Sequence, residues 1–304
     1  MIELARSSVQ TWECDQMGHM NVQFYVEKSC DALTALGARI GLGPKALRRQ
    51  GLKLEAAEQH VRFLRELRPG APYVLRGGVA KAEVMALTAY SELTITGSDT
   101  VAATFRTTAR LVDAKDGAQV SFDDGARAMA THLTVAIPDH GSPRGLALEP
   151  PRDPALTLGE AEAMKLTPTY RGVVRPWECD GEGEMPPRFF MARVSDAIPN
   201  LLIQTSGHNR GAGGSQGGAA LEYRFVYRKR PRAGDIVVVM SGLKAVGAKT
   251  YIWAHWLFDG ETGEALASAE AVAVAMDLTT RKAIALSGDF RARLETLVIE
   301  GLTV

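Results

Sequence analysis

The chain has 304 residues, which is long enough for two domains of ordinary size. Its 35 basic and 35 acidic residues balance, which argues against nucleic acid or an anionic membrane surface as the main partner. No apolar run approaches the roughly 18 residues of a membrane span and no signal-peptide pattern opens the chain, so we expect a cytosolic protein. Three cysteines and six scattered histidines predict neither a disulfide framework nor a metal site.

The most informative feature is an internal duplication of the whole chain. The tetrapeptide Trp-Glu-Cys-Asp begins at Trp12 and again at Trp177, 165 residues later. A repeat of this length is a domain and not a solenoid unit. We therefore predict domains at 1–138 and 166–304, joined by a proline-containing linker at 139–165. Further matched pairs are Val9 and Val174, Gly70 and Gly234, Asp113 and Asp277, and Leu133 and Leu297.

In the first copy, the residue pattern predicts one long helix surrounded by strands. A strand is expected at 7–13, followed by a turn through Gly18. Apolar residues at helical spacing predict a helix at 21–40, with Asn21 as N-cap. Four extended segments and a short closing helix follow, at 52–65, 73–84, 87–96, 101–113 and 125–133.

The second copy repeats this order. A strand at 172–178 and a helix at 188–205 correspond to the first two elements. The glycine-rich stretch 207–218 lacks the sequence of a phosphate-binding loop, so we interpret it as a mobile loop. Strands are expected at 219–229, 236–243, 250–258 and 265–277, and a closing helix at 289–299.

This order of elements predicts an α+β fold in which an antiparallel sheet curls around a central helix. The run Asp15-Gln16-Met17-Gly18-His19-Met20-Asn21, followed by Phe24-Tyr25, resembles the hotdog-fold thioesterases of the 4-hydroxybenzoyl-CoA thioesterase type. Their pattern is Asp-x-x-Gly-His-(Val/Met)-Asn with an aromatic residue one turn later. The resemblance implies a tandem double hotdog whose two halves pair within one chain as an intramolecular pseudo-dimer, which can associate further into a homo-oligomer. It also implies an acyl-CoA substrate, no cofactor, and a site between the paired units.

The motif contains the groups that thioester cleavage requires. Asp15 is the candidate nucleophile or general base, and backbone N–H groups around Asn21 and Val22 are the candidate oxyanion hole, because a helix start presents unpaired donors. Gly18 allows close approach of the acyl group. His19 is expected to orient Asp15 or donate to the thioester, and Asn21 to hold water. The alternative is that Asp15 shapes the turn and that Asn21 caps the helix.

Other residues near the motif are candidates for substrate binding. We expect Trp12 and Tyr25 to contact the substrate together with Arg62 and Arg65. A basic group after the first helix, Lys45, Arg48 and Arg49, either meets the phosphates of CoA or forms a solvated helix face.

The second copy has lost most of these groups. Asp180 corresponds to Asp15, but Glu182 and Glu184 stand where the first copy has Met17 and His19. Mutual repulsion should leave one of the three carboxylates protonated or turned to water. Prolines replace Asn21 and Val22 and remove two backbone donors. We interpret this half as a degenerate second site that provides structural support.

The leading hypothesis is hydrolysis of an acyl-CoA thioester by a cytosolic enzyme. An acyl-carrier-protein (ACP) thioesterase is a close alternative, although the plant enzymes of that kind have Asn where this chain has Met17. A hotdog dehydratase or hydratase, and a module that binds acyl thioesters without cleaving them, represent other classes. The acyl group is not identified by the sequence.

Overall fold

The structure is a computed structural model that describes residues 1–206, 216–277, 279–280 and 282–304. The chain divides into two compact units, Met1–Pro143 and Arg144–Val304. Most of the loop expected at 207–218 lies outside the described residues. Among the described residues, no helix has both the length and the apolar character needed to cross a membrane.

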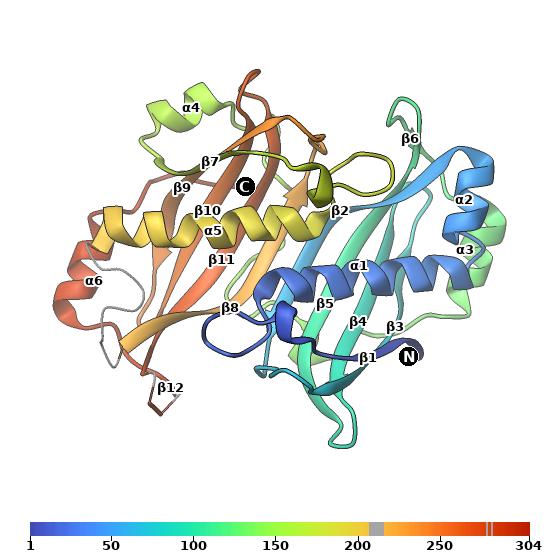
Figure 1. The fold of residues 1–304 in the computed structure, drawn as a ribbon, viewed down its shortest axis with the longest axis horizontal. Helices are drawn as coiled ribbons and strands as arrows, with labels where there is room; N and C mark the ends of the chain where they lie inside the picture. Colours follow the sequence, from blue (N-terminus) through green and yellow to red (C-terminus); the bar gives the residue numbers. More distant parts are fainter. Residues whose placement is uncertain (207–215, 278, 281) are drawn as a thin grey trace. The chain divides into compact units, whose positions relative to one another are not determined.

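The first unit is an antiparallel sheet with one long helix packed across it (Figure 1). The strand order is β1-β3-β4-β5-β2, with the short strand β6 paired to β5. Its elements are β1 (Ile2–Ser8), η1 (Thr11–Glu13), α1 (Val22–Arg39), α2 (Pro44–Gln50), β2 (Leu52–Phe63), β3 (Pro72–Ala82), β4 (Leu87–Ile95), β5 (Thr100–Asp113), β6 (Gln119–Val120), α3 (Asp124–Thr131) and η2 (Asp139–Gly141).

Helix α1 begins where the sequence predicts. The Asn21 side chain accepts a hydrogen bond from the Gln23 N–H, as an N-cap does. The helix buries Val26, Leu33 and Leu36, which recur at helical spacing and face the sheet. Burying such side chains stabilises the fold by about 1.5–3 kcal/mol each.

The second unit repeats the arrangement, with α5 packed on the sheet. Its strand order is β7-β9-β10-β11-β8, with β12 paired to β11. The elements are α4 (Leu158–Ala163), β7 (Thr167–Val173), η3 (Pro176–Glu178), α5 (Pro187–Ser206), β8 (Gln216–Tyr227), β9 (Ile236–Val246), β10 (Thr250–Asp259), β11 (Ala265–Asp277), β12 (Lys282–Ala283) and α6 (Gly288–Glu295). The predicted α+β class with antiparallel sheets is confirmed in both units.

Three local predictions differ from the structure. The strands expected at 7–13 and 172–178 lie five residues earlier, because Thr11–Glu13 and Pro176–Glu178 form 3-10 turns. Helix α2 was not predicted; its Pro44 occupies the first helical turn. The segment 139–165, which was predicted as a linker, contains η2 and α4.

The segment after α3 is held against the outer face of the first sheet. Arg62 donates hydrogen bonds from Nη1 to the carbonyl oxygens of Asp139, His140 and Ser142, at 3.4, 2.8 and 2.6 Å. On β4, buried Glu92 lies 2.7 Å from Nε2 of His140 and also accepts a hydrogen bond from the Tyr90 hydroxyl. These contacts anchor the start of the expected linker, so the segment belongs to the packed structure of the first unit.

Candidate active site

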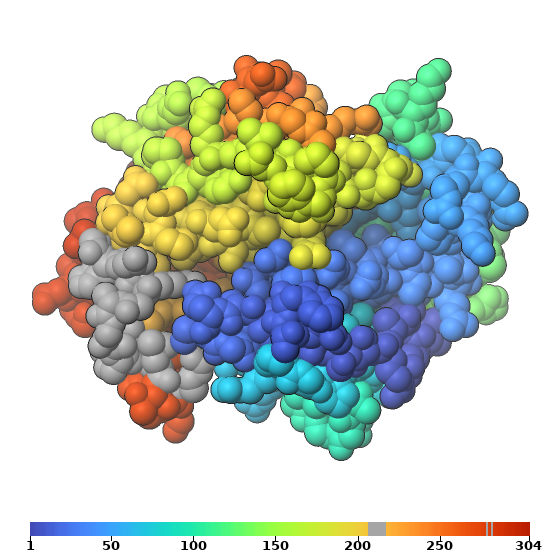
Figure 2. Space-filling model, viewed as in Figure 1, coloured from blue at the N-terminus to red at the C-terminus, as the bar shows by residue number. Residues whose placement is uncertain are grey.

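The first-copy motif forms a tight turn closed by backbone hydrogen bonds. The Asp15 N–H donates to the His19 carbonyl at 3.0 Å, and the Asn21 N–H donates to the Glu13 carbonyl at 2.8 Å. Gly18 adopts a φ of 76°, which glycine tolerates and most residues do not. The turn therefore holds Asp15, His19 and the start of α1 close together, and this segment lies at the surface (dark blue in Figure 2).

The Asp15 carboxylate is partly anchored and partly available. Its Oδ1 accepts a hydrogen bond from the Met17 N–H at 2.8 Å, which fixes the side chain over the turn. The side chain is 21% exposed, and Oδ2 has no hydrogen-bond partner within the part of the chain that the structure describes. One carboxylate oxygen is thus held by the protein while the other can act on a substrate or on water.

The start of α1 leaves one backbone donor for an oxyanion. The Asn21 N–H is already bonded to the Glu13 carbonyl, so the expectation that it serves the oxyanion hole is wrong. The Gln23 N–H is bonded to the Asn21 side chain. In contrast, the Val22 N–H has no hydrogen bond among the described residues. Val22 therefore remains the candidate donor, with the helix dipole reinforcing it.

A buried ion pair secures this turn to the helix. The Glu13 carboxylate accepts hydrogen bonds from the Gln10 N–H at 2.8 Å and from Lys28 Nζ at 2.7 Å. Both Glu13 and Lys28 are buried. Because the Glu13 carbonyl also accepts from Asn21, a single residue ties the turn to α1 at two points. This explains the Glu in the repeated tetrapeptide, to which the sequence analysis assigned no role.

His19 lies between two carboxylates. Its Nδ1 is 3.7 Å from Asp15 Oδ1, and its Nε2 is 3.5 Å from Glu66 Oε1. Glu66 lies outside the motif and beyond the end of β2, so the motif did not predict it. A signal was present in the duplication, because Arg230 occupies the corresponding place in the second copy and reverses the charge.

The four residues expected to bind substrate differ in their exposure and in the face of the sheet on which they lie. Trp12 is 73% exposed on η1 and can contact a ligand. Tyr25 is buried, and its hydroxyl donates to the Arg65 carbonyl at 3.4 Å; burial raises the pKa of this phenol. The Arg65 side chain is exposed beside it.

Arg62 is directed away from the site. Phe63 contacts Tyr25 of α1, with ring centroids 5.2 Å apart, and successive residues of a strand point to opposite faces of the sheet. The Arg62 guanidinium therefore lies on the face opposite α1, where it binds the segment 139–142. Its expected role in substrate binding is wrong.

The basic residues of α2 also lie far from Asp15. The 18-residue helix α1 spans about 27 Å, and α2 follows its far end. Lys45, Arg48 and Arg49 line a shallow hollow of about 510 Å³ there. The structure thus places these basic residues at the end of α1 away from Asp15.

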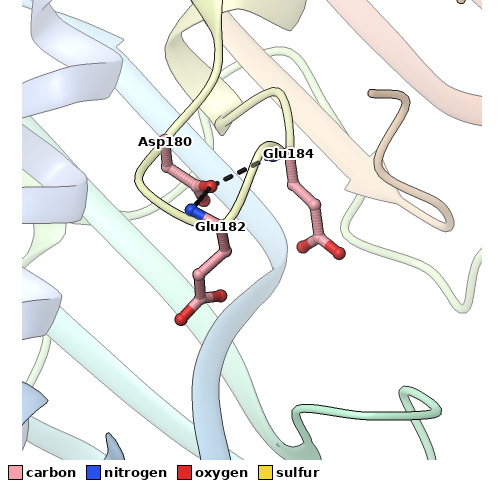
Figure 3. A group of neighbouring side chains, drawn as sticks. All are labelled: Asp180, Glu182 and Glu184. Atoms are coloured by element: carbon pink, nitrogen blue, oxygen red, sulfur yellow. Dashed lines mark hydrogen bonds between the residues drawn. The ribbon is translucent and has the colours of Figure 1, made fainter. Parts of the chain in front are cut away.

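In the second copy the turn keeps its backbone but changes its charges. The Asp180 N–H donates to the Glu184 carbonyl at 2.9 Å, and Gly183 has a φ of 81°. Figure 3 shows the Asp180 carboxylate directed at the backbone N–H groups of Glu182 and Glu184, which donate to it at 2.9 and 3.1 Å. At the position of His19 the second copy has Glu184, a third carboxylate beside Asp180 and Glu182.

The expected repulsion between these carboxylates is relieved by arginines. One oxygen of each of Asp180, Glu182 and Glu184 lies within 4.8 Å of the others. Arg232 Nη2 is 3.0 Å from Glu184 Oε1, and Arg230 Nη1 is 3.9 Å from Asp180 Oδ2. The nearby positive charges offset the acidic group, so it fits an ion-pair network.

The second helix begins without the donor that distinguishes the first. Helix α5 starts at Pro187, the counterpart of Val22, and Pro186 replaces Asn21. Proline is tolerated in the first turn of a helix but has no N–H. The second copy therefore has an aspartate at the turn and lacks both the histidine and the helix-start donor.

The first unit is similar to a known family. Residues 9–138 match the model of the thioesterase-like superfamily. No curated protein matches the chain by sequence.

Several solved structures share the fold over most of the chain. A putative oleoyl thioesterase from Lactobacillus plantarum matches with a TM-score of 0.68 and 11% identity, covering 89% of this chain and 94% of its own. An acyl-ACP thioesterase from Bacteroides thetaiotaomicron has a TM-score of 0.64 and 10% identity, with 88% and 96% covered. A 12:0-ACP thioesterase from Umbellularia californica has a TM-score of 0.64 and 10% identity, with 89% and 93% covered. The family match thus lies in the first unit, which contains the motif turn, and the solved structures show that the chain shares the fold of these proteins.

Proposed function

We propose that the protein hydrolyses acyl thioesters, with Asp15 as the nucleophile or general base and the Val22 N–H as the oxyanion donor. The observation that carries the proposal is the pairing of a half-anchored carboxylate with an unbonded helix-start N–H in a single turn. The two groups supply what thioester cleavage needs, a nucleophile or base and a donor for the developing negative charge.

The chemistry follows from these positions. The Val22 N–H donates to the carbonyl oxygen as negative charge develops there. Asp15 either attacks the carbonyl carbon, giving a mixed anhydride that water then hydrolyses, or removes a proton from an attacking water. In both routes the carbon–sulfur bond breaks, and the products are a carboxylic acid and a free thiol. No cofactor takes part in this scheme.

We propose CoA as the thiol carrier, with ACP as the second candidate. The motif resembles that of acyl-CoA thioesterases, and Met17 departs from the plant acyl-ACP pattern. Two of the structural relatives are named as thioesterases of acyl-ACP, which is why the second candidate is retained. The remoteness of Lys45, Arg48 and Arg49 from Asp15 leaves the CoA phosphates without an assigned partner.

The test is hydrolysis by the purified full chain of matched acyl groups presented on CoA and on ACP. Loss of thioester absorbance should be followed, because Cys14, Cys30 and Cys179 are free thiols that would react with thiol reagents. We expect turnover with at least one carrier, and kcat/KM identifies the preferred one. Binding without turnover on either carrier would favour a non-catalytic module. Interconversion of enoyl and 3-hydroxyacyl thioesters without hydrolysis would favour a hydratase.

A further inference from the structure

Helix α2 carries a group of cations that no acid balances. The whole chain has equal numbers of basic and acidic residues, but the stretch between Asp31 and Glu55 contains five basic residues and no acidic one. Three of the five, Lys45, Arg48 and Arg49, lie on α2 and are exposed. None of the three forms an ion pair or a side-chain hydrogen bond within the part of the chain that the structure describes. The dipole of α2 favours Arg48 and Arg49 in its last turn but disfavours Lys45 in its first turn.

Two other short helices of the chain pair an arginine with an acid of the same helix. Arg127 binds Asp124 in α3, and Arg291 Nε lies 2.8 Å from Glu295 Oε1 in α6. Helix α2 contains no acidic residue that could do the same. Its cations stand three and four residues apart on one face, where like charges repel each other and destabilise a helix. No acid of α2 offsets this repulsion.

The three cations border a hollow that contains no other charged group. Its volume is about 510 Å³, and the remaining lining residues are small or apolar: Ala38, Gly41, Gly43, Pro44 and Ala46. Arginine and lysine are the side chains that bind phosphate oxygens, arginine through two parallel hydrogen bonds and lysine as a point charge. The size and the charge of the hollow therefore fit a small anion that carries several phosphate groups.

The second copy has no equivalent group of cations. In the sequence, its long helix is followed by the glycine-rich stretch 207–218, which contains one arginine and no lysine. The basic group thus belongs to the first copy only, as the complete motif with Asp15 and His19 does. Because both units have the same fold, the fold itself does not require these cations.

We propose that the hollow on α2 is a binding site for a small polyphosphate anion, held by Lys45, Arg48 and Arg49. The hollow lies at the end of α1 away from Asp15 (Figure 1), so its ligand does not contact the reacting groups and binding does not depend on hydrolysis. Two sources offer this chemistry. One is the phosphates of CoA, if its chain extends along α1, and the other is a free nucleotide that binds apart from the thioester.

The test is calorimetric titration of the full chain with tripolyphosphate, a probe that presents phosphate groups alone. We expect saturable binding that weakens as salt is raised, because salt screens the charges. Arg48→Gln should weaken binding about tenfold, which is the scale of one lost charge-assisted hydrogen bond. Arg39→Gln is the matched control, because Arg39 is exposed at the end of α1 and does not line the hollow. It should bind within about twofold of the wild type, since salt screens more distant exposed charges.

Competition identifies the source of the phosphates. Displacement of tripolyphosphate by CoA at lower concentration than by ATP, with none by pantetheine, indicates the nucleotide part of CoA; the reverse order indicates a free nucleotide. The inference would be overturned if the wild type bound tripolyphosphate no more tightly than sulfate. Unchanged binding in a folded variant with Lys45, Arg48 and Arg49 all replaced by Gln would also overturn it. None of these measurements requires hydrolysis, so a failure of the proposed function is detected separately.

Discussion

The two copies have the same backbone at the motif and different chemistry around it. Asp15 and Asp180 open equivalent turns, closed by the same hydrogen bonds and by a glycine with positive φ. In each copy a buried cation of the helix binds the Glu of the tetrapeptide, through Lys28 in the first and Arg193 in the second. The chemical groups at the turn differ, with His19 against Glu184 and Val22 against Pro187. The stability of the shared turn and the activity of the differing side chains can therefore be tested separately.

The largest expected effect is on stability, where the copies should behave alike. Lys28→Met and Arg193→Met each leave a buried glutamate without its cation, and such changes typically cost about 3–5 kcal/mol of unfolding free energy. Only Lys28→Met should also reduce hydrolysis, because its turn carries Asp15. Denaturant unfolding and initial rates measure the two effects. Equal losses of activity in both variants would remove the distinction between the copies.

The next effect concerns the helix-start donor. Val22→Pro reproduces in the first copy what Pro187 does in the second, and proline at this position does not prevent a helix. Removal of one oxyanion donor should lower kcat about 100- to 1,000-fold. Val22→Ala keeps the N–H and serves as the control. If Val22→Pro folds normally and retains most of its kcat, the oxyanion is bound elsewhere.

The sequence predicted helices and strands whose apolar residues recur regularly. It did not predict contacts between residues that are distant in sequence and close only in the folded chain. Helix α1 and strands β2 to β5 follow from their apolar patterns and from the Asn21 cap. Arg62 was wrongly assigned to substrate binding, because β2 contains a bulge and its pattern of apolar and polar residues does not show which side chains face α1. Glu66 was invisible to motif reasoning, since only the folded turn brings it to His19. The alignment of the two copies could have revealed it through the change to arginine.

A buried histidine distinguishes the second sheet from the first. His255 is fully buried beside Ser241, its Nδ1 2.8 Å from the Ser241 hydroxyl, whereas Ser91 occupies this place in the first sheet. Burial lowers the pKa of His255 to about 4 from the ordinary 6.5. The folded protein thus holds this imidazole neutral while the unfolded chain protonates it, so the stabilisation is present above pH 6.5 and is lost as the pH falls to 4.

The expected loss is about 3 kcal/mol across that interval, from about 1.4 kcal/mol per pKa unit. Denaturant unfolding at several pH values should show that His255→Gln removes this part of the slope. His132→Gln, which replaces an exposed histidine, should keep the wild-type slope. Parallel curves for the wild type and His255→Gln would show that His255 does not titrate in this interval.

The smallest expected effect is a gain of function in the second copy. In an Asp15→Asn background, we would convert Glu184, Pro186, Pro187 and Arg230 to His, Asn, Val and Glu, which restores the groups of the first copy around Asp180. Hydrolysis should rise measurably, by several-fold or more over Asp15→Asn alone, if helix-start donors and the histidine are what the second copy lacks. No recovery in a well-folded variant would mean that pocket shape silenced this half.

The most direct test of the account compares Asp15→Asn with Asp180→Asn in the same thioesterase assay. The two residues sit in equivalent turns, so a purely structural role would predict similar consequences for both. We predict that Asp15→Asn lowers kcat/KM about 100-fold or more with the fold intact, and that Asp180→Asn stays within about threefold of the wild type. An Asp15→Asn protein with near wild-type activity, or a greater loss in Asp180→Asn, would contradict the assignment of the working site to the first copy.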